Sequence, residues 1–249
     1  MLAPTLRRVH GGRGLRHQLQ VVAGWETLLS RTILAMTAEL FQADGVSGFL
    51  HRADSPTGRG MVLTHGAGGN CRMPLLVAAA TAFAAAGFDV LRCDLPFRQR
   101  RPTGPPSPAG AAADREGLRL AVAALRGSGP TRVVLGGQSY GGRQATMLAA
   151  ERPDLAQALL LFSYPLHPPG KPERLRTEHF PRLRLPCVFV QGANDPFGTP
   201  DELRDAIAAI PALAQMIAID GAGHDLKRGR LDLAPVVIAV GAACDRAST

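Results

Sequence analysis

Residues 137–141 read Gly-Gln-Ser-Tyr-Gly, and a further glycine follows. The motif lies between a short β-branched run that predicts a strand and an Ala-rich stretch that predicts a helix. In a tight strand-to-helix turn, a serine hydroxyl projects above the sheet near the positive end of the helix. Glycines two positions away on either side allow strand and helix to pack without a Cβ clash. The spacing therefore predicts Ser139 as a nucleophile.

A serine nucleophile needs a general base, which a carboxylate must orient. His224 directly follows the last predicted strand, in the segment Gly-Ala-Gly-His-Asp. Asp195 follows the preceding predicted strand, in Gly-Ala-Asn-Asp-Pro. The chain order serine, aspartate, histidine favours Asp195 and His224 as the acid and the base of a triad. Asp220, at the end of its own strand, is the alternative acid.

Acyl transfer also requires hydrogen-bond donors for the developing oxyanion. The backbone N–H of Tyr140, the residue after the nucleophile, is the expected first donor. Residues 65–69 read His-Gly-Ala-Gly-Gly and follow an early predicted strand, so their backbone can approach a substrate closely. We expect the second donor at Ala67, with Gly68 as the alternative and as a substrate-binding residue. His65 is expected to shape this loop and not to act as a second base.

The elements that must position these residues alternate between strand and helix. This alternation predicts an α/β fold: a mostly parallel, doubly wound sheet with helices on both faces and a short antiparallel hairpin at one edge. The Pro-rich segment that ends near residue 180 is too short for a separate cap domain. Strands are predicted at residues 38–41, 46–52, 60–64, 88–93, 132–136, 157–162, 187–191 and 215–219, and helices at 73–86, 111–126, 141–151, 201–210 and 231–244.

Composition excludes several other classes. The net charge of +8 raises the question of nucleic acid. The arginines are spread along the chain, however, and no nucleic-acid motif is present, so we expect no nucleic-acid partner. No apolar run is long enough to span a bilayer, and no membrane partner is expected. The four cysteines form no C-x-x-C pair. We therefore expect reduced thiols, a cytoplasmic location, and neither a metal nor an organic cofactor.

The first 35 residues differ from the rest. They contain five arginines and one glutamate, with a cluster of glycines. Three interpretations are open: a secretory signal, which lacks a clear apolar core; an Arg-rich transit peptide; and a start codon placed too early, with Met36 as the true start. The last is favoured. In each case residues 1–35 are an extension outside the fold, and residues 36–249 form the catalytic domain.

Four segments together resemble one known family. They are Gly-Gln-Ser-Tyr-Gly-Gly-Arg at 137–143, Tyr-Pro-Leu-His-Pro-Pro-Gly-Lys-Pro at 164–172, Gln-Gly-Ala-Asn-Asp-Pro-Phe-Gly at 191–198 and Gly-His-Asp-Leu-Lys at 223–227. The chain resembles, over about residues 38–245, the α/β-hydrolase-like family. That family includes a testis-expressed protein, a subunit of the nonspecific-lethal chromatin complex, and bacterial proteins labelled dienelactone-hydrolase-like.

The resemblance implies a small lidless hydrolase with its triad at Ser139, Asp195 and His224. It implies no particular substrate. Dienelactone hydrolases proper use a cysteine nucleophile, and Ser139 departs from that pattern.

The expected function is hydrolysis of a small ester or thioester through an acyl-enzyme, as in carboxylesterases and thioesterases. Tyr164 and His167 are expected to bind substrate at the rim of the site. A hypothesis is that a basic rim favours anionic acyl groups; the alternative is a solvated basic surface. The other residues expected at this rim are Phe97, Arg98, Arg100, Arg101, Lys171, Arg174 and Arg176. The alternative function is a non-catalytic protein-interaction module on a hydrolase scaffold, which the chromatin-complex resemblance suggests.

Overall fold

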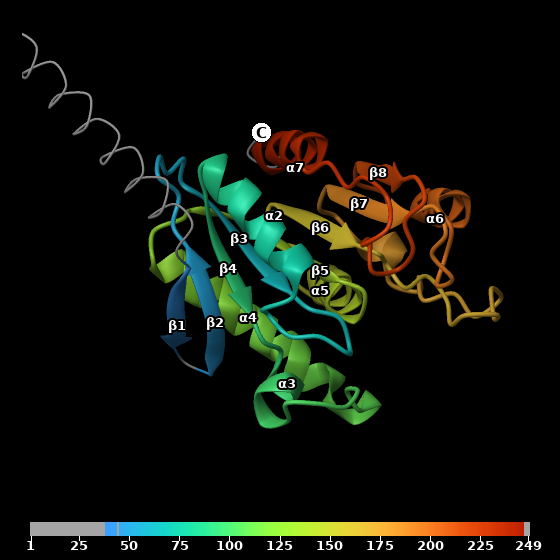
Figure 1. Cartoon of the computed structure of the whole chain (residues 1–249), viewed down its shortest axis with the longest axis horizontal. Helices are drawn as coiled ribbons and strands as arrows, with labels where there is room; N and C mark the ends of the chain where they lie inside the picture. The colour runs from blue at the N-terminus through green and yellow to red at the C-terminus, as the bar shows by residue number, and fades with distance from the viewer. Residues whose placement is uncertain (1–37, 44, 247–249) are drawn as a thin grey trace, which may run out of the picture. The chain divides into compact units, whose positions relative to one another are not determined.

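A computed structural model describes residues 38–43 and 45–246. Their centre is one eight-stranded sheet, shown in Figure 1, with the strand order β1-β2-β4-β3-β5-β6-β7-β8. The predicted N-terminal extension lies outside the described residues, as does Asp44 in the predicted hairpin turn. The strands are β1 (Glu39–Ala43), β2 (Val46–His51), β3 (Arg59–Thr64), β4 (Phe88–Cys93), β5 (Arg132–Gln138), β6 (Ala158–Phe162), β7 (Cys187–Gly192) and β8 (Ala214–Ile219).

Strand pairing agrees with the predicted α/β pattern. From β4 to β8 all neighbouring strands are parallel. β1 pairs with β2, and β2 with β4, in antiparallel fashion, so the leading hairpin forms one edge of the sheet. A parallel sheet buries both faces, which explains why central strands such as Ala-Leu-Leu-Leu-Phe of β6 are apolar throughout.

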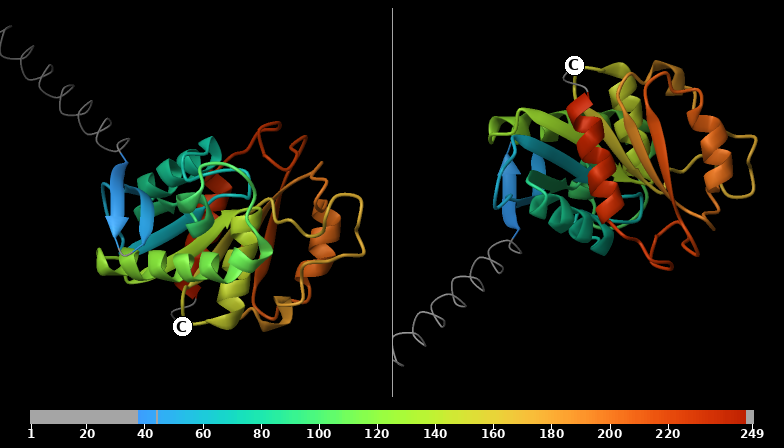
Figure 2. Two further views of the ribbon diagram at one scale, coloured as in Figure 1. Left: turned by 90° about the horizontal axis from the view of Figure 1, so that it is seen from below. Right: turned by 90° about the horizontal axis from the view of Figure 1, so that it is seen from above.

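Helices cover both faces, as Figure 2 shows in its two views. The helices are α2 (Pro74–Ala85), α3 (Pro96–Arg100), α4 (Ala111–Gly127), α5 (Tyr140–Glu151), α6 (Pro200–Ile207) and α7 (Ala234–Arg246). α2 and α7 pack over one face, and α4 and α5 over the other. Two apolar cores result, one on each side of the sheet. The predicted fold class is therefore confirmed.

Two loops flank the carboxyl ends of the central strands. Between β4 and α4 the chain forms the short helix α3, where the sequence predicted only irregular structure. Between β6 and β7, residues 163–186 contain a single 3-10 turn, Phe180–Arg182, and no domain is inserted there. Within the described part of the chain, no helix combines the length and the apolar character needed to cross a bilayer.

Candidate active site

Ser139 occupies the turn between β5 and α5 in a backbone conformation that non-glycine residues rarely adopt, with φ 51° and ψ −118°. The neighbouring glycines make this turn possible. A Cβ on Gly137 would lie 2.9 Å from backbone atoms of Gly141 and Gly142. A Cβ on Gly141 would lie 2.5 Å from the carbonyl oxygen of His65. Both glycines are therefore required by close backbone approach, as the motif predicted.

The three expected triad side chains meet at the carboxyl ends of the parallel strands. Nε2 of His224 lies 2.8 Å from Oγ of Ser139, and its Nδ1 lies 2.8 and 3.0 Å from the two carboxylate oxygens of Asp195. A carboxylate only accepts, so Nδ1 donates to Asp195 and Nε2 of the neutral ring accepts from the serine hydroxyl. The structure thus joins Asp195, His224 and Ser139 in one chain of hydrogen bonds, and Asp220 takes no part in it.

Gln191, the penultimate residue of β7, supports the acid. It is fully buried, and its Nε2 donates to Oδ2 of Asp195 at 2.9 Å and to the carbonyl of Gly198 at 2.8 Å. The backbone N–H of Phe197 donates to the other oxygen of Asp195 at 2.9 Å. The carboxylate, which is 2% exposed, is therefore fixed from three sides, counting His224. Sequence reasoning missed Gln191, because a buried polar residue inside a strand carries no motif of its own.

The Phe197 ring also packs against the imidazole. Its centroid lies 4.2 Å from that of His224, with 33° between the planes. This contact covers one face of the base and limits its rotation. Phe197 is thus a second positioning residue contributed by the loop that carries Asp195.

The loop after β3 lies beside the nucleophile. A Cβ on Gly66 would lie 3.3 Å from the Cβ of Ser139, so only glycine fits there comfortably. The carbonyl of Gly66 accepts from Nδ1 of His65 at 2.8 Å and from the N–H of Gly69 at 3.1 Å. In the trans peptide between Gly66 and Ala67, the Ala67 N–H points away from the Gly66 carbonyl. The two bonds that hold this carbonyl therefore also fix the direction of the Ala67 N–H.

Tyr140 is the first residue of α5, so its N–H has no carbonyl to pair with inside the helix. The structure therefore leaves both expected oxyanion donors, at Tyr140 and Ala67, on segments adjacent to Ser139. Gly68 is exposed, with open space around its Cα.

Comparisons with known proteins identify the family to which this fold belongs. A family model described as "Alpha/beta hydrolase domain" matches residues 57–234. The chain belongs to this α/β-hydrolase domain family. The match covers every element from β3 to β8, including the segments that carry the three expected triad residues.

Solved structures share the fold of this α/β-hydrolase at low sequence identity. Dienelactone hydrolase from Anabaena variabilis has a TM-score of 0.62 and 21% identity, over 83% of this chain and 95% of that one. XC6422 from Xanthomonas campestris, described as an α/β serine hydrolase without lid, has a TM-score of 0.63 and 18% identity, over 84% and 94%. Est1E from Butyrivibrio proteoclasticus has a TM-score of 0.62 and 16% identity, over 85% and 98%.

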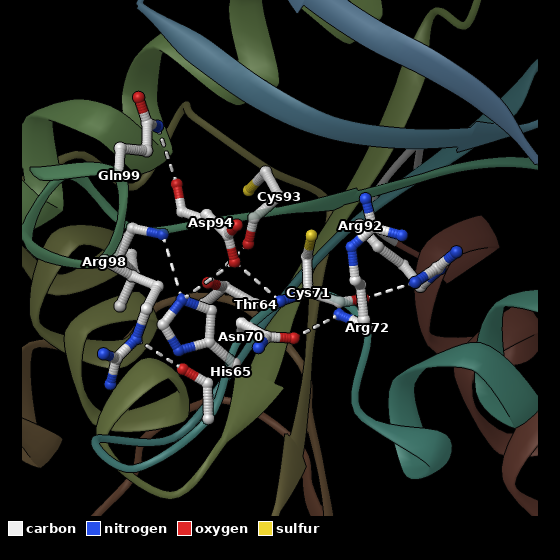
Figure 3. A network of polar contacts seen from close by, with 12 residues as sticks. Thr64, His65, Asn70, Cys71, Arg72, Arg92, Cys93, Asp94, Arg98 and Gln99 are labelled. Atoms are coloured by element: carbon white, nitrogen blue, oxygen red, sulfur yellow. Dashed lines mark hydrogen bonds and ion pairs between the residues drawn. The ribbon is translucent and has the colours of Figure 1, made fainter. Parts of the chain in front are cut away.

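His65 shapes the loop after β3 through both ring nitrogens; this loop carries the expected oxyanion donor at Ala67 and is called the oxyanion loop below. Nδ1 donates to the Gly66 carbonyl, so the neutral ring accepts the Leu95 N–H at Nε2, 3.1 Å away. Figure 3 shows the His65 ring with Asp94 and Arg98 beside it. The side chain is completely buried, and burial lowers its pKa. The ring is therefore neutral and already engaged, as expected of a loop-shaping residue.

Arg98 holds the same loop from the other side, in a position that the sequence did not predict. It was expected at the rim, yet it is only 6% exposed. Its guanidinium donates to the carbonyls of Ala67 at 2.9 Å and Gly69 at 2.7 Å, and also to those of Arg101 and Gly104. These carbonyls accept four hydrogen bonds from the guanidinium, so Arg98 supports the loop; the expectation that it also lines a substrate rim stays a prediction. Arg98 is a positioning residue for the oxyanion loop.

A buried carboxylate links α3, α4 and the turn that carries Ser139. Asp114 is fully buried in α4 and accepts the Phe97 N–H at 3.0 Å and the Tyr140 hydroxyl at 2.7 Å. Burial, together with this hydrogen bond, raises the pKa of Tyr140, so its hydroxyl stays protonated and donates. The side chain of Tyr140 thus anchors the residue whose backbone is the expected oxyanion donor.

The two expected substrate-binding residues of the Pro-rich segment differ in their surroundings. Tyr164 is fully buried in the apolar core against Phe180 and Phe189, and its hydroxyl donates to the Arg176 carbonyl at 2.7 Å. The expectation that Tyr164 contacts substrate is therefore wrong. His167 is 5% exposed, and its Nδ1 donates to the Pro168 carbonyl at 2.9 Å. The Pro-rich segment folds back onto the core and buries Tyr164, whereas His167 lines a cavity of about 320 Å³ together with Glu202, so its expected contact with substrate stays a prediction.

Proposed function

We propose that this α/β-hydrolase cleaves a small ester or thioester through an acyl-enzyme on Ser139. The observation that carries the proposal is the hydrogen-bond chain from Asp195 through His224 to Ser139. Nδ1 of His224 lies 2.8 Å from Oδ2 of Asp195, and its Nε2 lies 2.8 Å from Oγ of Ser139. These distances are those expected of a nucleophile and its general base. A non-catalytic interaction module would have no need of such a chain.

In the proposed first half-reaction, Oγ of Ser139 attacks the substrate carbonyl carbon while Nε2 of His224 takes its proton. Asp195 stabilises the imidazolium and holds its tautomer. The N–H groups of Tyr140 and Ala67 donate to the oxyanion. His224 then returns the proton to the leaving alkoxide or thiolate, and the acyl group remains on Ser139.

In the second half-reaction water replaces the leaving group. His224 takes a proton from the water as its oxygen attacks the acyl carbonyl. Collapse of the tetrahedral species expels Oγ of Ser139, which regains the proton from His224. The products are a carboxylic acid and an alcohol or thiol.

The test is turnover of p-nitrophenyl butyrate and of an S-butyryl thioester by wild type, Ser139→Ala and Ser163→Ala. Ser163 is the control serine: like Ser139 it has a positive φ (49°), but it is fully buried and its Oγ has no hydrogen-bond partner among the described residues. We expect Ser163→Ala to keep wild-type turnover and Ser139→Ala to lose it. Turnover that survives in Ser139→Ala would refute the role of Ser139. A folded wild-type protein with no turnover of either substrate would favour the interaction-module alternative.

A further inference from the structure

A polar cavity of about 400 Å³ lies between α5 and the Pro-rich segment. Three arginines, Arg143, Arg174 and Arg176, contribute to its lining, together with two glutamates, Glu173 and Glu178. No ion pair joins any of these five side chains to another among the described residues. The lining thus carries three positive and two negative side chains, a formal excess of one positive charge, and its arginines form no close ion pair among the described residues.

These arginines differ from those with structural roles elsewhere in the domain. Arg59 and Arg132 pair with Asp245, and Arg98 donates to backbone carbonyls. In contrast, the Arg143 side chain has no hydrogen-bond acceptor within the described part of the chain, and its Nε is buried. An unsatisfied buried donor destabilises a protein, so a retained one calls for an explanation.

Arg176 has a single side-chain acceptor in the described ranges, the Pro165 carbonyl at 3.3 Å. Burial, and then the positive charge of Arg143, lower its pKa, and Arg174 adds to this effect. The guanidinium groups are therefore close enough to repel one another. A bound anion would offset that repulsion and supply the missing acceptors.

Two short connections relate the cavity to the triad, whose own residues are not part of its lining. Arg143 follows Ser139 by four residues, and its N–H donates to the Ser139 carbonyl at 2.9 Å. Four residues of helix advance about 6 Å and return to the same face. On the other side, Pro168 of the lining follows His167, whose N–H bonds to the carbonyl of Phe197, the residue packed on His224.

We propose that this cavity, lined by Arg143, Arg174 and Arg176, binds an anionic group, carboxylate or phosphate, carried by the substrate whose carbonyl reacts at Ser139. The assignment of a substrate group rests on the proposed function; the anion site itself does not. Glu173 and Glu178 are exposed and extend the cavity wall without occupying the guanidinium donors.

The first arm of the test compares p-nitrophenyl pentanoate with the p-nitrophenyl half-ester of glutaric acid, which has the same carbon count and a carboxylate at neutral pH. We expect wild type to prefer the half-ester. Arg174→Ala should lower kcat/KM for the half-ester about tenfold and that for pentanoate less than twofold. The control Arg184→Ala removes an exposed arginine outside this lining and should change neither. Equal turnover of the two esters by wild type would overturn the proposal.

The second arm measures binding of inorganic phosphate to Ser139→Ala protein by calorimetry at low ionic strength, where hydrolysis cannot interfere. We expect binding that Arg174→Ala weakens at least fivefold and Arg184→Ala leaves unchanged. We also expect phosphate to inhibit half-ester turnover competitively and pentanoate turnover little. Equal inhibition of both esters would overturn the substrate role in favour of a free regulatory anion.

The two arms separate the two proposals. Arginine-dependent phosphate binding in a protein with no esterase activity would refute the proposed function and leave the anion site standing. Ester turnover with no phosphate binding and no preference for the half-ester would refute the anion site and leave the hydrolase function standing.

Discussion

Substituting Gly141 by alanine tests most sharply how the start of α5 packs against the segment that carries His65. The new Cβ would lie 2.5 Å from the carbonyl oxygen of His65 and 2.6 Å from Cγ2 of Thr64. The first contact is backbone and cannot move without shifting the oxyanion loop. Overpacking of this kind destabilises a protein by about 1–3 kcal/mol. For a domain of this size that corresponds to a fall in Tm of roughly 2–12 °C.

Gly241→Ala is the matched control. Gly241 lies inside α7, and a Cβ there would have nothing within 4 Å. Alanine in a helix interior is favoured over glycine by about 0.8–1 kcal/mol, so this variant should be more stable than wild type. Gly141 is the second residue of α5, so the helix-interior gain does not apply there in full, and a loss of stability in Gly141→Ala reports mainly the clash.

The assays are urea unfolding and p-nitrophenyl ester turnover. Misplacing a catalytic donor by about 1 Å costs on the order of 100-fold in rate. Gly141→Ala should therefore remain folded, within the loss of stability given above, while its ester turnover falls by about that factor. If Gly141→Ala matched Gly241→Ala in both assays, the close approach of α5 to the His65 carbonyl would be refuted.

Three other substitutions test individual contacts. Asp195→Asn should lower kcat about 10⁴-fold with little change in fold, because the amide no longer enforces the Nδ1–H tautomer of His224. Ester kinetics measure kcat and circular dichroism checks the fold; a near-wild-type kcat would contradict the prediction. Tyr140→Phe should destabilise the domain by about 1.5–3 kcal/mol in urea unfolding, because Asp114 loses a donor, while kcat falls less than tenfold since the backbone N–H remains. The pKa values of His51 and His179 are lowered to about 4, mainly by burial, so between about pH 6.5 and 4 the unfolded chain binds more protons than the folded one and stability falls as the pH decreases. His179→Gln should make the fall in the urea midpoint from pH 7 to 5 shallower. An unchanged slope would exclude His179 as a contributor.

The order of strands and helices could be predicted from the sequence because the strands are buried on both faces and the helices end at clear signals. The helix predicted at 73–86 corresponds to α2, and the chain turns away from it at Gly87, which has a φ of 90°. α3 was missed because five residues beginning at Pro96 are too few to show a helical period. The turn with Ser139 and the loops with Asp195 and His224 were predictable because each directly follows a strand.

The supporting contacts could not be predicted in the same way. Arg98 was placed at the rim because arginine is usually exposed, but its acceptors are carbonyls 29 and 31 residues away in the chain. Tyr164 directly follows a strand end, where substrate-binding residues often lie, yet tertiary packing turns it into the core. Such contacts depend on the path of loops, which local patterns do not encode.

The central claim, that Ser139 is an activated nucleophile, is tested most directly by covalent labelling. The protein would be incubated with a fluorophosphonate probe, digested, and the modified peptide mapped by mass spectrometry, with Asp195→Asn as the variant that keeps the serine and weakens its activation. The account predicts modification at Ser139 in wild type and much slower modification in Asp195→Asn. Absence of labelling in folded wild-type protein, or labelling at another residue, would contradict it.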